Sequence, residues 1–117
     1  MAHSSMLRAS CEANQIQLDV SVVIDPTQSC GVTHYRELLT FTDNLLVGDS
    51  EALNGAREQL RAVVGDEGVI RAAGAVGTFQ MMNRALDTLG AQLGKELNPE
   101  LRLLADKLNM TPPAHWV

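Results

Sequence analysis

Aromatic side chains are scarce in this chain of 117 residues: it has one tryptophan, one tyrosine and two phenylalanines. Because 45% of the residues are nevertheless hydrophobic, the core must be built mainly from Leu, Val, Ala and Met. Such side chains suit helices packed on helices. The length is that of one ordinary domain, so we expect a single domain over residues 1–117.

Basic residues are few as well, and they do not cluster. Nine Lys and Arg residues stand against fourteen Asp and Glu residues, which gives a net charge of −5. No basic run could neutralise several phosphates, so we expect no nucleic-acid partner. No apolar run approaches the roughly 20 residues that cross a bilayer, and the start lacks a secretory pattern. We therefore expect a cytoplasmic protein without a membrane partner.

Cysteine is limited to Cys11 and Cys30, which form no CxxC or CxxH pair. Two isolated cysteines cannot build a disulfide framework, so reduced thiols are the expectation. Adding His3 and His34 gives four potential zinc ligands, but their spacing matches no compact zinc site. The sequence thus predicts neither a metal nor a cofactor.

Residues 16–24 alternate between apolar and polar side chains after a loop-like start at 1–15. This alternation, Ile-Gln-Leu-Asp-Val-Ser-Val-Val-Ile, predicts a β-strand with one buried face. No second segment alternates in the same way, and a lone strand leaves its backbone groups unpaired. We expect the strand to pair antiparallel with its copy in a second chain, or to lie along the helices as an irregular arm.

A helical period begins after Thr33, the expected N-cap, and helices are predicted at 34–47, 50–64, 67–89 and 99–108. Glycines follow the first three, at positions 48, 65 and 90, and an Asn-Pro-Glu sequence opens the fourth. Asp49 or Ser50 caps the second helix. The fold class is therefore mainly α, with about four helices in a core at 34–108, the N-terminal strand, and an extended tail at 109–117.

The segment 69–82 is apolar or small at almost every position, so it is either the central helix or a seam between subunits. Its small residues Ala73, Gly74 and Gly77 let another helix approach closely. Trp116, a large apolar side chain, ends the extended tail. Together with the unpaired strand, these features predict an obligate homo-oligomer, most simply a dimer.

The stretch from Tyr35 to Gly90, which includes "YRELLTFTDNLL" and "GTFQMMNRALDTLG", resembles the C-terminal helices of the carboxymuconolactone decarboxylase and alkylhydroperoxidase-like family. The resemblance covers about half of the chain and rests on packing motifs. It implies the C-terminal half of the alkylhydroperoxidase-like fold. In the hydroperoxidase members, an upstream CxxCxxxH motif and a preceding Glu supply a peroxide-attacking thiolate, a resolving thiol and proton transfer.

The chain departs from that catalytic motif. Cys30 and His34 reproduce its last cysteine and its histidine, but Thr27 occupies the position of the other cysteine. The long helix that precedes the motif is replaced by the predicted strand at 16–24. Two functions remain open: a non-catalytic binding or assembly module on this scaffold, or a weak thiol-dependent peroxidase or related enzyme with Cys30 and His34 as catalytic residues.

Overall fold

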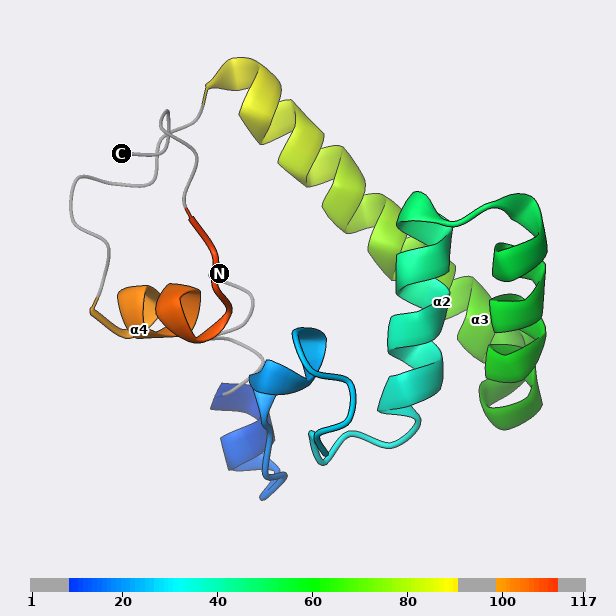
Figure 1. Cartoon of the computed structure of the whole chain (residues 1–117), viewed down its shortest axis with the longest axis horizontal. Helices are drawn as coiled ribbons and strands as arrows, with labels where there is room; N and C mark the ends of the chain where they lie inside the picture. The colour runs from blue at the N-terminus through cyan, green and yellow to red at the C-terminus, as the bar shows by residue number, and fades with distance from the viewer. Residues whose placement is uncertain (1–8, 91–98, 112–117) are drawn as a thin grey trace. The chain divides into compact units, whose positions relative to one another are not determined.

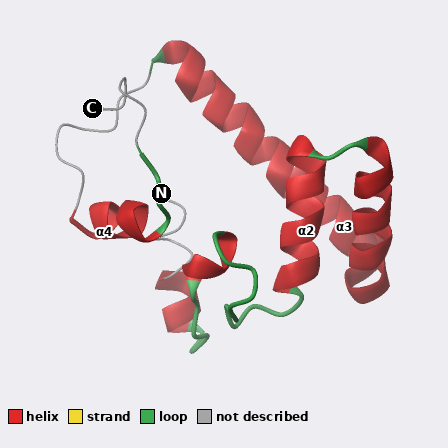
Figure 2. Cartoon of the chain, viewed as in Figure 1, coloured by secondary structure: helices red, strands yellow, loops and turns green. Residues whose placement is uncertain are grey.

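The computed structural model describes residues 9–90 and 99–111, which form two compact units. Unit 1 comprises the described residues of Met1–Val32 and Asp87–Val117, and unit 2 comprises Thr33–Leu86 (Figure 1). Helices dominate both units, and the described residues contain no strand (Figure 2). The predicted mainly α class is confirmed at this level.

Unit 2 is built from α2 (Tyr35–Val47) and most of α3 (Ser50–Leu89). Gly65 interrupts α3 with φ 73° and ψ 177°, a conformation that is essentially restricted to glycine. It divides α3 into a first segment, residues 50–64, and a second segment, residues 66–89. The predicted helices at 34–47, 50–64 and 67–89 are thereby confirmed to within one residue.

Of the N-caps predicted for α2 and α3, only the one for α3 is confirmed. The Asp49 carboxylate accepts a hydrogen bond of 2.8 Å from the Ala52 amide and caps α3. The predicted cap at Thr33 is wrong, because His34 occupies the N-cap of α2 and makes no side-chain cap bond. Its left-handed backbone (φ 58°) turns the chain into the helix one residue later than expected.

The core of unit 2 joins α2 to both segments of α3. Its buried centre consists of Phe41, Leu60 and Val69, and Leu60 is completely inaccessible to solvent, at 0% exposure. Half-buried apolar side chains surround this centre: Leu38, Leu45, Leu53, Val64, Ala72 and Ala73. Because only the first turns of the second segment contribute, the core ends well before α3 does.

Unit 1 contains a 3-10 turn, η1 (Val20–Val23), where the sequence predicted the strand at 16–24. That prediction is wrong. The expected pairing of two copies of this strand is therefore wrong as well. Asp19 accepts a 3.0 Å hydrogen bond from the Ser21 amide, and the Ile24 amide donates to the Ser21 carbonyl at 2.9 Å. Local bonds thus satisfy the backbone groups that a strand would have left unpaired.

Two short helices complete unit 1 and end in the same way. Residues 9–13 are helical, which corrects the expected loop at 1–15, and α4 (Pro99–Lys107) confirms the helix predicted at 99–108. Left-handed Gln15 and Asn109 follow these helices. The next amides donate back to the Cys11 and Ala105 carbonyls at 2.8 and 2.9 Å, the Schellman pattern. Of the expected tail, residues 112–117 lie outside the described residues, Trp116 among them.

Candidate functional site

Cys30, the predicted nucleophile, lies in unit 1 and is 3% exposed. Its carbonyl oxygen accepts a hydrogen bond of 3.3 Å from the Asp19 amide, which draws the chain before η1 against this loop. Gly31 follows with φ 78°, and a Cβ there would lie 2.0 Å from the Gln17 carbonyl oxygen. Glycine is therefore required for the close approach that encloses the thiol.

His34, the predicted proton-transfer partner, lies in unit 2 and is exposed at the start of α2. A catalytic thiolate needs both solvent access and an adjacent positive group. Because the Cys30 side chain is buried, the requirement for solvent access is not met. The pairing of Cys30 with His34 remains a prediction.

No three His, Cys, Asp or Glu side chains of residues 9–90 and 99–111 are grouped so that they could hold a metal ion. His3, one of the four potential zinc ligands in the sequence, lies outside the described residues. Among the described helices, none combines the length and the apolar character that a bilayer crossing demands.

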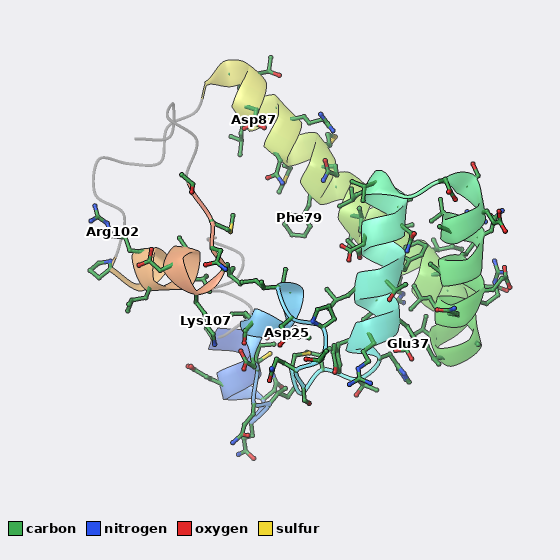
Figure 3. All side chains as sticks on the ribbon, viewed as in Figure 1. Asp25, Glu37, Phe79, Asp87, Arg102 and Lys107 are labelled. Carbon is green, nitrogen blue, oxygen red and sulfur yellow. The ribbon has the colours of Figure 1, made fainter. Side chains whose placement is uncertain are left out.

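Within unit 2, the second segment of α3 has more exposed large apolar residues than α2 or the first segment: Ile70, Phe79, Met81 and Leu86. It is about 36 Å long, whereas α2 is about 20 Å long and cannot cover it. Figure 1 shows this segment extending past α2, and Figure 3 labels Phe79 and Asp87 along it. Ile70 is 70% exposed and Met81 is 67% exposed. These large side chains are candidates for contacts with another protein.

Four residues of the second segment lie on one outward line, which we call the outer seam: Ile70, Gly74, Gly77 and Met81. Their spacings of four, three and four residues keep them within about 60° of one another around a helix. All four are exposed, and nothing lies within 4 Å of where a Cβ of either glycine would be. The inward face, which contains Val69, is about 100° away.

Sequence reasoning missed this line because the helical spacing of six other residues predicts them as the main stripe of the helix: Ala72, Val76, Phe79, Met82, Leu86 and Leu89. Part of that stripe does face the core, since Ala72 packs against the buried centre. The spacing of Ile70, Gly74, Gly77 and Met81 was the signal that could have revealed a second face. Two glycines within the line concealed it, because they carry no hydrophobic side chain.

Charged groups flank the outer seam. Glu67 lies one turn before Ile70 and pairs with Arg71, with 2.5 Å between Oε1 and Nη2. Arg84 lies three residues beyond Met81 and is also exposed. Near the break at Gly65, Arg61 donates to Glu58 and to Asp66, and these two hydrogen bonds raise the pKa of its guanidinium. Arg61 thereby links the two segments of α3 across the break.

Comparisons of the chain with protein-family models, with curated proteins and with solved structures gave no match.

Proposed function

We propose that the chain is a non-catalytic helical assembly module that binds a second copy of itself through the second segment of α3. The observation that carries the proposal is the exposure of Ile70 and Met81 on a helix that is too long for its own unit to cover. In this proposal, the chain has a helical scaffold similar to that of the carboxymuconolactone decarboxylase-like family but lacks the catalytic cysteine pair of that family.

Association would remove the exposed apolar side chains of this surface from water. Burying a large aliphatic side chain contributes about 1.5–3 kcal/mol, and a symmetric pair would bury Ile70 and Met81 twice each. This gain is comparable with the free energy that two chains lose on association, about 4–15 kcal/mol. Burial of Ile70 and Met81 therefore offsets a large part of this cost, and we expect a dimer whose dissociation constant depends strongly on both residues.

The surroundings of Cys30 support an assembly function over thiol chemistry. A peroxide-reducing cysteine must be reached by its substrate, and Cys30 is buried beside the close contact between Gly31 and Gln17. Cys11, the other thiol, is buried as well. Neither side chain offers the accessible nucleophile that such an enzyme requires.

Multi-angle light scattering on the intact chain, over a series of concentrations, tests the proposal. We expect the weight-average mass to rise from 12.6 kDa toward twice that value as the concentration increases. A folded chain that stays at 12.6 kDa throughout the micromolar range would contradict it.

A further inference from the structure

We propose that Gly65 and Gly68 form a hinge in α3, and that straightening of this hinge allows two chains to exchange the second segment. In the exchanged dimer, Val69 of each chain completes the core of the other chain. The inference goes beyond the proposed function, because it concerns the buried centre of unit 2 and needs none of the exposed side chains of the outer seam. The carrying observation is that the break in α3 is what requires glycine at both positions.

Gly65 is the whole connection between the two segments of α3. Helical residues precede and follow it directly, and Figure 1 shows α3 changing direction there. Its backbone, with φ 73° and ψ 177°, lies in a region that essentially only glycine adopts. None of the described residues lies within 4 Å of the point that its Cβ would occupy, so the backbone conformation alone restricts this position to glycine. A straight helix would place no such restriction on residue 65.

Gly68 is required by the close approach of Val64 across the break. A Cβ on Gly68 would lie 2.6 Å from the Val64 Cβ and 2.5 Å from the Val64 Cγ2. In an unbroken helix, residues four apart have their Cβ atoms about 5–6 Å from each other. A larger side chain at position 68 would therefore collide with Val64 in the broken form but would be accommodated in a straight helix.

Straightening of α3 would separate Leu60 from Val69. In the broken form, both belong to the buried centre that contains Phe41. In a straight helix, residues nine apart are about 14 Å apart along the axis and about 180° apart around it. One α2 cannot cover two side chains that point to opposite sides, so Val69 must leave the core of its own chain. The same movement exposes the complementary surface on a second chain.

The exchange keeps the core contacts and changes mainly the hinge. Each rebuilt core contains Phe41 and Leu60 of one chain and Val69 of the other, so the same apolar side chains are buried in both forms. The ion pair between Arg61 and Asp66 is lost, because residues five apart lie on different faces of a straight helix. That pair is exposed and contributes little to stability. The hinge and the chain concentration therefore decide between the two forms.

The two glycines hold the second segment against its own chain. Glycine is a poor helix former, and alanine in its place favours a helix interior roughly fivefold at each position. An exchanged dimer contains four such positions, two in each chain. Gly65→Ala/Gly68→Ala should also disfavour the broken form, for the reasons given above. We expect this double variant to raise the constant for formation of the exchanged dimer at least about a hundredfold.

Refolding in the Ile70→Glu background tests the exchange separately from the proposed surface contact. Chains with and without Gly65→Ala/Gly68→Ala are refolded from urea at millimolar concentration, diluted, and measured by size-exclusion chromatography with light scattering. We expect the chain with both alanines to stay at twice 12.6 kDa after dilution, because dissociation of an exchanged dimer requires the core to open. With both glycines kept, the persistent dimer should be a minor fraction that grows with the refolding concentration.

Gly55→Ala is the matched control for the two hinge substitutions. It adds a methyl group at an open helical position of the first segment, away from the break. The substitution favours the helix equally in both forms, so the fraction of persistent dimer should stay unchanged. An increase as large as that of the double variant would contradict the role assigned to Gly65 and Gly68.

Isotope-filtered NMR identifies the exchanged contact. Labelled and unlabelled chains are refolded together, and only contacts between different chains are recorded. We expect contacts from the Val69 methyl groups of one chain to Phe41 or Leu60 of the other. In the broken form, these contacts lie within one chain and are absent from the filtered spectrum.

The outcomes separate the inference from the proposed function. A double variant that is helical by circular dichroism and monomeric after dilution would refute the hinge, and a persistent dimer without Val69 contacts between chains would refute the exchange. If the double variant does not fold, the Ile70→Glu chain with both glycines decides: a persistent dimer with these contacts supports the inference, and its absence overturns it. Absence of concentration-dependent association in the intact chain would contradict only the proposed function.

Discussion

Asp19 and Lys107, 88 residues apart in the sequence, form an ion pair with 2.9 Å between Oδ1 and Nζ. The same carboxylate accepts hydrogen bonds from the hydroxyl and the amide of Ser21. One side chain thus caps η1 and fastens it to α4, where Figure 3 labels Lys107. This link joins the N-terminal and C-terminal parts of unit 1.

The ion pair and hydrogen bonds of Asp19 predict that the stability of unit 1 depends on pH. The hydrogen bond from the Ser21 hydroxyl, followed by Lys107, holds the pKa of the Asp19 carboxyl well below its ordinary value of 3.8. A lowered pKa in the folded state stabilises the fold above about pH 4, and that contribution is lost as the pH falls further. We expect the Ser21 amide to lose hydrogen-exchange protection between pH 5 and pH 2, relative to its intrinsic exchange rate.

Asp19→Asn is the variant that isolates this effect. It should reduce the protection of the Ser21 amide at pH 6 and flatten its dependence on pH below 5. Asp106→Asn, which changes an exposed carboxylate of α4, is the matched control and should behave as the unmodified chain does. Equal pH profiles for Asp19→Asn and the unmodified chain would contradict the assigned role.

Replacing Gly31 and replacing Gly55 with alanine should change the free energy of unfolding in opposite directions. Gly31→Ala should lower the free energy of unfolding by more than about 1 kcal/mol, because Gly31 has φ 78° and its Cβ would collide with the Gln17 carbonyl. Gly55→Ala should raise it by about 0.5–1 kcal/mol, since the position is helical and open. Urea denaturation followed by circular dichroism measures both, and a stabilising Gly31→Ala would refute the close approach.

Leu60 should be the most sensitive core position in unit 2. Leu60→Ala removes a side chain with 0% exposure from between Phe41 and Val69, so we expect a loss of about 2–5 kcal/mol in the free energy of unfolding. Val47→Ala, at an exposed position of α2, should cost less than about 0.5 kcal/mol. Similar losses at the two positions in thermal or urea unfolding would argue against this core.

Both cysteines should be protected from alkylation by the folded structure. Cys11 and Cys30 are buried, so iodoacetamide should modify them slowly, at similar rates that rise together when denaturant is added. Peptide mass spectrometry over a time course gives each rate separately. Selective and fast modification of Cys30 in the folded chain, together with turnover of peroxide, would restore the enzymatic hypothesis.

The helices of unit 2 could be predicted from the sequence because their ends carry local signals. Asp49 caps α3, Gly65 breaks it and Gly90 follows it with φ 62°, and each acts through its own backbone or side chain. Phe41 was missed as a core residue, because helical spacing predicts a different set as the buried side of α2: Tyr35, Leu38, Leu39, Thr42, Leu45 and Leu46. The Thr42 hydroxyl instead donates to the Leu38 carbonyl of the same helix at 2.8 Å.

The N-terminal region could not be predicted from alternation alone. Ile16, Leu18, Val20 and Val22 follow the period of a strand, but a strand also needs a neighbour to bond with. Asp19 and Ser21, the polar members of that pattern, form bonds that favour a tight turn instead. The partner of Asp19 is Lys107, and no local pattern encodes a contact between residues so distant in the chain.

The candidate site, too, could be predicted from the sequence only in part. The sequence identified the segment 69–82 as apolar on more sides than one domain buries, and the exposure of Ile70 and Met81 agrees with this. It could not distinguish the face that packs on Phe41 from the face that stays exposed, since that division depends on where α2 ends. The Cys30 and His34 pair was inferred from spacing alone, which carries no information about burial.

Sedimentation equilibrium of the intact chain and of two matched variants tests self-association through the second segment of α3 most directly. Ile70→Glu and Leu103→Glu each place a carboxylate at a position that is 70% exposed, but only Ile70 lies on the outer seam. We expect Ile70→Glu to raise the dimer dissociation constant by about tenfold or more and Leu103→Glu to leave it within about twofold. Equal dissociation constants for the intact chain and Ile70→Glu would contradict the account.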